Sequence, residues 1–110
     1  MENPSESGRN EIYFKVKTPL KVEIRTTRDY WQYIIKVKHP AMEGKEAIVK
    51  NTLKAPDEIR QSKIDKEIFL YYKRVDKLYC VVAKHLNGTG FLITAYPSDK
   101  IKEGDSIWKK

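Results

Sequence analysis

The sequence predicts an α+β fold in which two N-terminal helices pack on an antiparallel sheet of about four strands, with a short hairpin before the helices. Between residues 28 and 55 the apolar residues recur at helical spacing, whereas from residue 67 onward they form runs rich in Val, Ile, Tyr and Phe. Helical segments followed by a succession of strands are typical of a domain whose helices cover one face of an antiparallel sheet.

The strongest strand signal is the stretch 78–96, around which we expect the rest of the chain to be organised. Two apolar runs, 78–83 and 91–93, lie on either side of an Asn87-Gly88 step. Asn-Gly adopts the positive φ angles of tight hairpin turns at little steric cost, so this step predicts a turn between two strands. The first run is apolar at consecutive positions, which indicates a central strand covered on both faces.

The segments before residue 40 predict a hairpin and then a helix. Apolar residues alternate in 11–17 and in 20–24, and Thr18-Pro19 between them marks a strand boundary. Thr27 is a residue type that caps helices, and the residues after it carry apolar side chains at helical spacing. This helix should end before Pro40, because a proline disfavours helical geometry in the residue that precedes it.

A second helix is expected to begin at Pro40, since the first turn of a helix does not need the N–H that proline lacks. Pro56 ends this helix. We interpret the short mixed segment 57–62 as an edge strand and 67–75 as a further strand that leads into the central hairpin. Residues 97–110 are interpreted as a polar, charged tail.

Composition indicates one folded domain. A chain of 110 residues is long enough for one core and too short for two, so we expect residues 11–110 to form a single domain after a flexible leader at residues 1–10. Cys80 is the one cysteine and cannot form an internal disulfide, and no apolar run approaches the ~20 residues that span a bilayer. A cytoplasmic protein without a membrane partner is therefore expected.

The formal net charge of +7 predicts attraction to phosphate polymers. The chain also contains seven Tyr, three Phe and two Trp. Aromatic faces beside Lys and Arg are the means by which proteins hold unpaired bases. RNA is therefore the partner that charge and aromatic content favour, although the same charge would also serve solubility alone.

No metal or cofactor is expected, because the two His and the single Cys lack ligand spacing and no glycine-rich phosphate loop is present. Three basic residues remain as candidates. His39 titrates near neutral pH and can exchange a proton, or it can simply satisfy a carbonyl at a helix end. The Arg60 guanidinium can clamp a phosphate, or it can be a solvated charge on a strand edge. Lys84 continues the apolar central strand, so its ammonium is either kept for an anion or extended to water.

The length of the hairpin loop decides which of these groups meet. With a two-residue turn, His85 shares a face of the hairpin with Thr94 and Tyr96, and Lys84 points to the other side. A loop of odd length reverses this arrangement and joins Lys84 to Thr94 and Tyr96. Sequence reasoning leaves both arrangements open.

Four segments occur in the order WQYIIKVKHP, GKEAIVKNTLKAPDEIRQS, LYYKR and YCVVAKHLNGTGFLITAYPSDKIKEG, and a final Trp follows them. This order resembles the small prokaryotic domains of the barnase, EndoU, colicin and RelE-like nuclease superfamily, in its phage-related branch. The resemblance covers about residues 20–108. It implies the same pair of helices on an antiparallel sheet.

The resemblance also implies metal-independent RNA cleavage, often by the toxin of a toxin-antitoxin pair, with a small acidic antitoxin as protein partner. In that chemistry the ribose 2′-hydroxyl attacks the neighbouring phosphorus while one group removes its proton and cations stabilise the transition state. Carried onto this chain, His39 is the acid or base, with Glu46 as the alternative base. Arg60 and Lys84 hold the phosphate, and Thr94 and Tyr96 orient it, unless Tyr96 stacks on a base.

A competing interpretation needs no chemistry. A non-catalytic RNA-binding or protein-interaction module on the same fold would explain the positive charge and the aromatic residues without a role for His39. Binding without turnover, with an affinity that falls steeply as salt rises, would distinguish this module from the enzyme.

Overall fold

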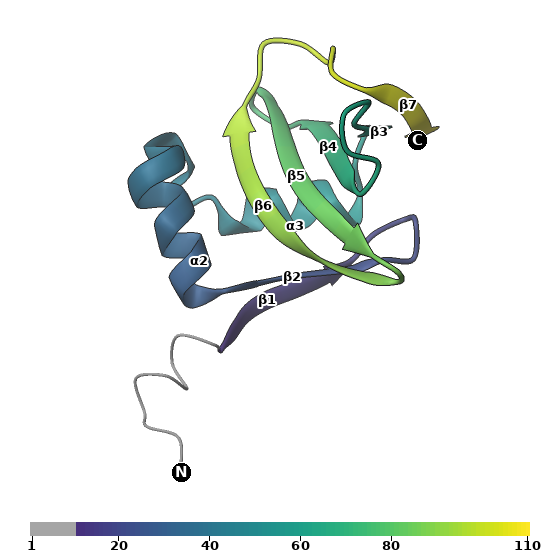
Figure 1. Cartoon of the computed structure of the whole chain (residues 1–110). Helices are drawn as coiled ribbons and strands as arrows, with labels where there is room; N and C mark the ends of the chain where they lie inside the picture. The colour runs from purple at the N-terminus through teal and green to yellow at the C-terminus, as the bar shows by residue number, and fades with distance from the viewer. Residues whose placement is uncertain (1–10) are drawn as a thin grey trace.

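The computed structural model describes residues 11–110, and the leader expected at residues 1–10 lies outside the described residues. All of its strands belong to one seven-stranded sheet of order β1-β2-β6-β5-β4-β3-β7 (Figure 1). The strands are β1 (Ile12–Lys17), β2 (Glu23–Thr27), β3 (Glu58–Gln61), β4 (Ile68–Arg74), β5 (Leu78–Leu86), β6 (Thr89–Pro97) and β7 (Asp105–Lys109).

The predicted fold class is wrong. The expected separate hairpin is part of the main sheet, because β2 pairs in parallel with β6 and so makes the sheet mixed rather than antiparallel. The expected polar tail contributes β7, which pairs with β3. Both additions rest on backbone hydrogen bonds between segments far apart in the sequence, and local apolar patterns carry no information about such pairing.

The helical part is also smaller than predicted. It consists of α2 (Arg28–Tyr33), a π-helical turn (Ile34–Lys38), a 3-10 turn (Pro40–Met42) and α3 (Glu46–Lys54). Thr27 caps α2 as expected, since its Oγ1 accepts a hydrogen bond from the Tyr30 backbone N–H at 3.1 Å. Pro40 begins only the 3-10 turn, because Gly44 follows with φ near +78° and interrupts helical geometry. No helix of residues 11–110 combines the length and the apolar character needed to cross a membrane.

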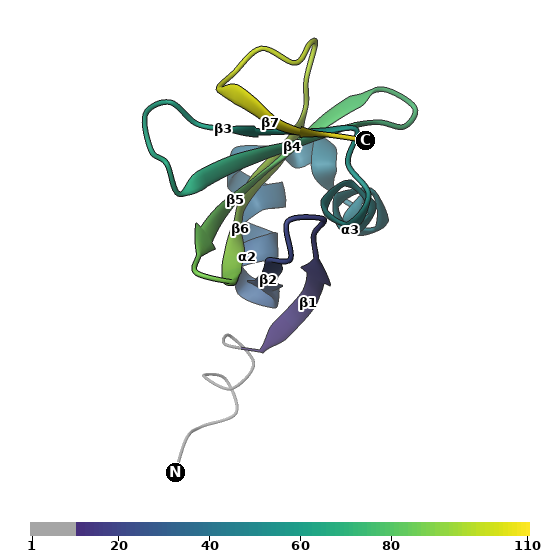
Figure 2. The ribbon, with the colours of Figure 1, turned by 90° about the vertical axis from the view of Figure 1, so that its right-hand side faces the viewer.

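Helix α3 packs against one face of the sheet, as Figure 2 shows from the side. The main core lies between them and includes Trp31, Val49, Leu53, Tyr71 and Val81, each with at most 1% of its surface exposed. No helix of residues 11–110 covers the middle of the opposite face, which is the face turned to the viewer in Figure 1.

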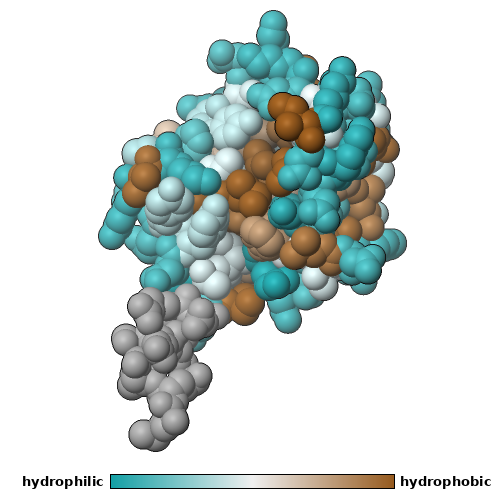
Figure 3. All heavy atoms as spheres, viewed as in Figure 1, coloured by the Kyte–Doolittle hydropathy of each residue, from teal (hydrophilic) through white to brown (hydrophobic). Residues whose placement is uncertain are grey.

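A second apolar cluster lies on that opposite face. Leu70, Tyr72, Leu78, Cys80 and Val82 are buried there under the partly exposed side chains of Ile68, Ile93, Tyr96 and Ile101. Apolar residues therefore remain visible in the middle of this face, between hydrophilic flanks (Figure 3). Strand β5 contributes to both clusters, and the prediction of a central strand buried on both faces is confirmed.

The hairpin between β5 and β6 has a two-residue turn and, in addition, a bulge. Leu86 pairs with Thr89, and the two turn residues have φ of 56° and 92°. Further along, Ala83 pairs with Leu92 but Val82 pairs with Thr94, so Ile93 is an extra residue in β6.

The bulge reverses the alternation that the short turn would impose. Beyond it, Thr94 and Tyr96 lie on the face of Val82, which is also the face of Lys84. His85 lies on the other face. The turn therefore has two residues. Lys84 nevertheless shares a face with Thr94 and Tyr96, which is the arrangement that the sequence predicted for a loop of odd length.

His85 is enclosed at the end of β5. Its ring stacks on Phe69 with 3.8 Å between centroids, and its Nε2 lies 2.8 Å from the Tyr71 hydroxyl. Burial disfavours the imidazolium form and lowers the pKa of His85 to about 4. This histidine is thus held neutral inside the fold.

We expect His85 to make the stability of the protein depend on pH. Because the pKa is near 6.5 in the unfolded chain and lower in the folded one, the unfolded state binds the proton first as the pH falls. The stabilisation is complete above pH 6.5 and is lost toward pH 4, by roughly 2–3 kcal/mol. Urea unfolding of the wild type and of His85→Gln at several pH values measures this loss. Equal pH dependence in the two proteins would contradict it.

Candidate functional site

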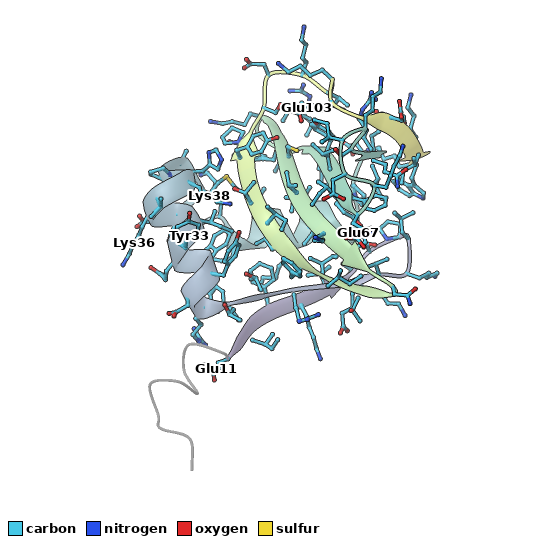
Figure 4. All side chains as sticks on the ribbon, in the orientation of Figure 1. Glu11, Tyr33, Lys36, Lys38, Glu67 and Glu103 are labelled. Atoms are coloured by element: carbon cyan, nitrogen blue, oxygen red, sulfur yellow. The ribbon has the colours of Figure 1, made fainter. Side chains whose placement is uncertain are left out.

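The candidate site lies along β6 on the sheet face that α3 does not cover. At the bulge, the Ile93 carbonyl oxygen accepts hydrogen bonds from the Tyr30 hydroxyl at 2.7 Å and from Lys38 Nζ at 3.3 Å. Lys38 points from the π-helical turn toward β6, whereas Lys36 points away from the sheet (Figure 4). Single π-helical turns are frequent at functional sites, and here the turn brings a lysine to the sheet.

His39 follows this turn and lies beside Tyr96. The two ring centroids are 5.1 Å apart, with 37° between the ring planes. Partial burial, and then the positive charge of Lys38, lower the pKa of His39, so the neutral imidazole is favoured near neutral pH. A neutral imidazole can accept a proton.

Tyr96 supports His39 rather than offering a free hydroxyl. Burial, and then the neighbouring Cys80 thiol, raise the pKa of Tyr96 far above its usual range. Its hydroxyl is thus directed toward Cys80, in the second apolar cluster, and its ring contacts His39. The negative charge of Glu103 also contributes to the raised pKa of Tyr96.

Thr94 and Lys84 share the face of Tyr96 but lie further along the strands. The Thr94 Oγ1 is buried and has no hydrogen-bond partner within residues 11–110. Lys84 Nζ lies 3.5 Å from a carboxylate oxygen of the exposed Glu67. Tyr96 pairs with Cys80 of β5, and Lys84 lies four residues further along that strand. Four residues of a strand span about 13 Å. His39 and Lys84 are therefore on one face but do not meet.

Arg60 is not available to a ligand. It lies on β3, three strands away from β6, and its guanidinium donates to the backbone carbonyls of Glu103 and Gly104 at 2.7 Å each. It also donates to a carboxylate oxygen of Glu58 at 2.7 Å. Gly104 has positive φ and lies so close to the Gln61 carbonyl that a side chain would clash there. Arg60 thus fixes the loop that leads into β7, and we remove it from the site.

Sequence reasoning missed a row of residues that crosses the sheet beside the bulge. Lys15 of β1 pairs with Arg25 of β2, Arg25 pairs with Phe91 of β6, and Phe91 pairs with Lys84 of β5. Paired residues in a sheet point to the same face, so Arg25 and Lys84 flank the Phe91 ring, and Lys15 lies beyond Arg25. We call these four residues the cross-strand row. No local pattern announces the row, because it exists only once β2 pairs with β6.

A small pocket lies between this row and α2. Its volume is about 220 Å³, and it is lined by Arg25, Thr26, Thr27, Tyr30, Phe91 and Leu92. Two aromatic rings and one guanidinium at a pocket of this size suit a planar base with a nearby phosphate. From Phe91 to Tyr96 the site extends about 16 Å along β6.

Within residues 11–110, no group of three or more His, Cys, Asp and Glu side chains is arranged to hold a metal ion. Comparisons with protein-family models, with curated proteins and with solved structures found no match. The function is therefore inferred from the residues and their geometry.

Replacement of Arg60 tests its structural role. Arg60→Ala removes three charge-assisted hydrogen bonds from a mostly buried side chain, so we expect the free energy of unfolding to fall by about 2–3 kcal/mol. Lys63→Ala is the control, because Lys63 makes only an exposed ion pair with Asp105 and should cost under about 1 kcal/mol. Similar losses in the two variants, measured by urea unfolding, would show that Arg60 is as dispensable as a surface charge.

Proposed function

We propose that the protein is a metal-independent endoribonuclease whose substrate lies along β6. The observation that carries the proposal is the neutral His39 imidazole, held against Tyr96 and next to the Lys38 ammonium, at one end of a surface lined with cations and aromatic rings. This combination suits a base that acts on a ribose hydroxyl beside a phosphate.

The proposed reaction is an attack of the ribose 2′-oxygen on the adjacent phosphorus. His39 accepts the hydroxyl proton, the O2′–P bond forms and the P–O5′ bond breaks. Lys38 stabilises the negative charge that develops on the phosphate oxygens, and water gives a proton to the leaving 5′-oxygen. The products are a 2′,3′-cyclic phosphate and a free 5′-hydroxyl.

The other residues position the substrate. Tyr96 fixes the His39 ring. The Thr94 hydroxyl is buried beneath this surface, so it takes no direct part in holding the phosphate. Phe91 and Tyr30 take a base in the small pocket, with Arg25 beside its phosphate. Lys84 contacts the RNA away from the reacting phosphorus. A toxin role, an acidic antitoxin partner and a cytoplasmic location remain predictions.

Cleavage of mixed RNA in the presence of EDTA tests the enzyme directly. We expect products that end in cyclic phosphate, and we expect His39→Ala and Lys38→Ala each to slow cleavage on the order of a hundredfold or more. Lys36→Ala is the matched control, since this lysine lies two residues away in the same π-helical turn but points away from the sheet, and the variant should cleave at the wild-type rate. Intact RNA at high protein concentration, with binding retained, would favour the non-catalytic module.

The pH dependence of cleavage tests the role of His39 separately. A general base must lose its proton, so kcat/KM should rise with pH, with an inflection below the usual histidine pKa near 6.5. Because the charge of Lys38 helps to lower the pKa of His39, Lys38→Ala should move the inflection to higher pH. An inflection at the same pH in Lys38→Ala and in the wild type would show that the charge of Lys38 does not affect the pKa of His39.

A further inference from the structure

A second cationic surface lies at the edge of the sheet, apart from His39. The end of strand β1 lies next to helix α3 (Figure 2), and the two elements enclose an open groove of about 580 Å³. The groove is lined by Lys15, Val16, Lys17, Ala47, Lys50, Asn51 and Lys54. It thus contains four lysines and no carboxylate.

The lysines form two pairs, whose spacing follows from the repeat of the α-helix and of the β-strand. Lys50 and Lys54 are one helical turn apart on α3, about 6 Å along its axis, on the stripe that also carries Ala47 and Asn51. Lys15 and Lys17 are alternate residues of β1, about 7 Å apart. The groove is therefore lined by two lysines of α3 on one side and, at the rim of β1, by two lysines that lie on the same face of the strand as the partner of Arg25.

These four lysines make no close ion pairs in residues 11–110, although Lys17 lies opposite Glu23 in the pairing of β1 with β2. Glu46, at the start of α3, is engaged by the Tyr13 hydroxyl at 2.7 Å. Lys50 Nζ lies 5.5 Å from the centre of the Phe14 ring, which holds it near the groove wall. Four ammonium groups around one groove repel one another, and an anionic ligand would relieve this cost.

The groove is connected to the candidate site. Lys15 belongs both to the groove and to the cross-strand row, where it pairs with Arg25, and Arg25 lines the small pocket beside Phe91. A continuous path of cations thus leads from α3 around the edge of the sheet to β6. An open groove with lysine walls and no buried polar group suits an extended chain of phosphates better than one enclosed phosphate.

We propose that the groove between β1 and α3 binds the sugar-phosphate backbone of single-stranded RNA that extends beyond the site along β6. The proposal deepens the proposed function and rests on it for the choice of RNA. It makes the preferred substrate a long RNA strand rather than a dinucleotide.

The test is binding of a fluorescent oligouridylate of about 12 nucleotides, within the site sizes of single-strand binders. Its 2′-O-methyl groups remove the attacking hydroxyl, so the result does not depend on cleavage. We expect Lys50→Gln/Lys54→Gln to bind roughly tenfold more weakly at low salt. Its slope of log K against log salt should be about 1.4 less steep, because each lost phosphate contact on a single strand contributes about 0.7.

The matched control is Lys36→Gln/Lys77→Gln, which removes the same charge from exposed positions outside the groove. It should change the salt slope little. Equal weakening in the two double variants would overturn the proposal, because net charge alone would then explain binding. Equally tight binding of uridine monophosphate in the groove would also overturn it, by showing a small-ligand site.

The two proposals fail in different ways. Groove-dependent binding without cleavage of unmodified RNA would remove the nuclease and leave the groove. Cleavage that depends on His39, together with unchanged binding in Lys50→Gln/Lys54→Gln, would remove the groove and leave the nuclease. Amine labelling of Lys50 and Lys54, measured with and without the oligonucleotide, gives a second result on the wild-type protein. RNA should protect both amines, and equal labelling would count against the groove.

Discussion

Ile93 has no partner residue on β5, and its carbonyl oxygen accepts hydrogen bonds from the Tyr30 hydroxyl and the Lys38 ammonium. A buried carbonyl without a partner is costly, so the extra residue in β6 is tolerated because the helical segment supplies these donors. The same contacts hold α2 and the π-helical turn against the sheet. Parallel pairing of β2 with β6 ends at Phe91, just before the bulge. The position of the helical segment and the path of β6 thus depend on one another.

The bulge also decides the chemistry of the exposed sheet face. Without it, Thr94 and Tyr96 would point into the main core with His85, and His39 would have no aromatic support. With the bulge, the two histidines lie in different environments. His85 packs against Phe69 and Tyr71 on the core face of the sheet, whereas His39 lies beside Tyr96 on the other face. One inserted residue in β6 therefore leaves His85 as a structural histidine on the core face and gives His39, the candidate catalytic histidine, its contact with Tyr96.

Sequence reasoning succeeded where the cause is local and failed where it is distant. The Thr27 cap, the Asn87-Gly88 turn and the burial of β5 on both faces follow from neighbouring residues. The parallel pairing of β2 and β6, and the addition of β7, depend on segments far apart, so the predicted α+β sheet of about four strands had too few strands. In the site, His39 and Tyr96 do meet, but Arg60 is taken up by the loop before β7. Lys38, Arg25 and Phe91 belong to the site through the bulge and the parallel pair, which no residue pattern reveals.

The geometry at the bulge can be measured in solution without RNA. Nuclear Overhauser contacts among the aromatic and methyl protons of the labelled protein report which side chains share a face of the hairpin. A bulge at Ile93 predicts contacts between the rings of His39 and Tyr96, and between the methyl groups of Thr94 and Val82. A regular hairpin predicts instead that the methyl group of Thr94 contacts Val81, which would then lie opposite it. Observation of that contact, with none between His39 and Tyr96, would contradict the account.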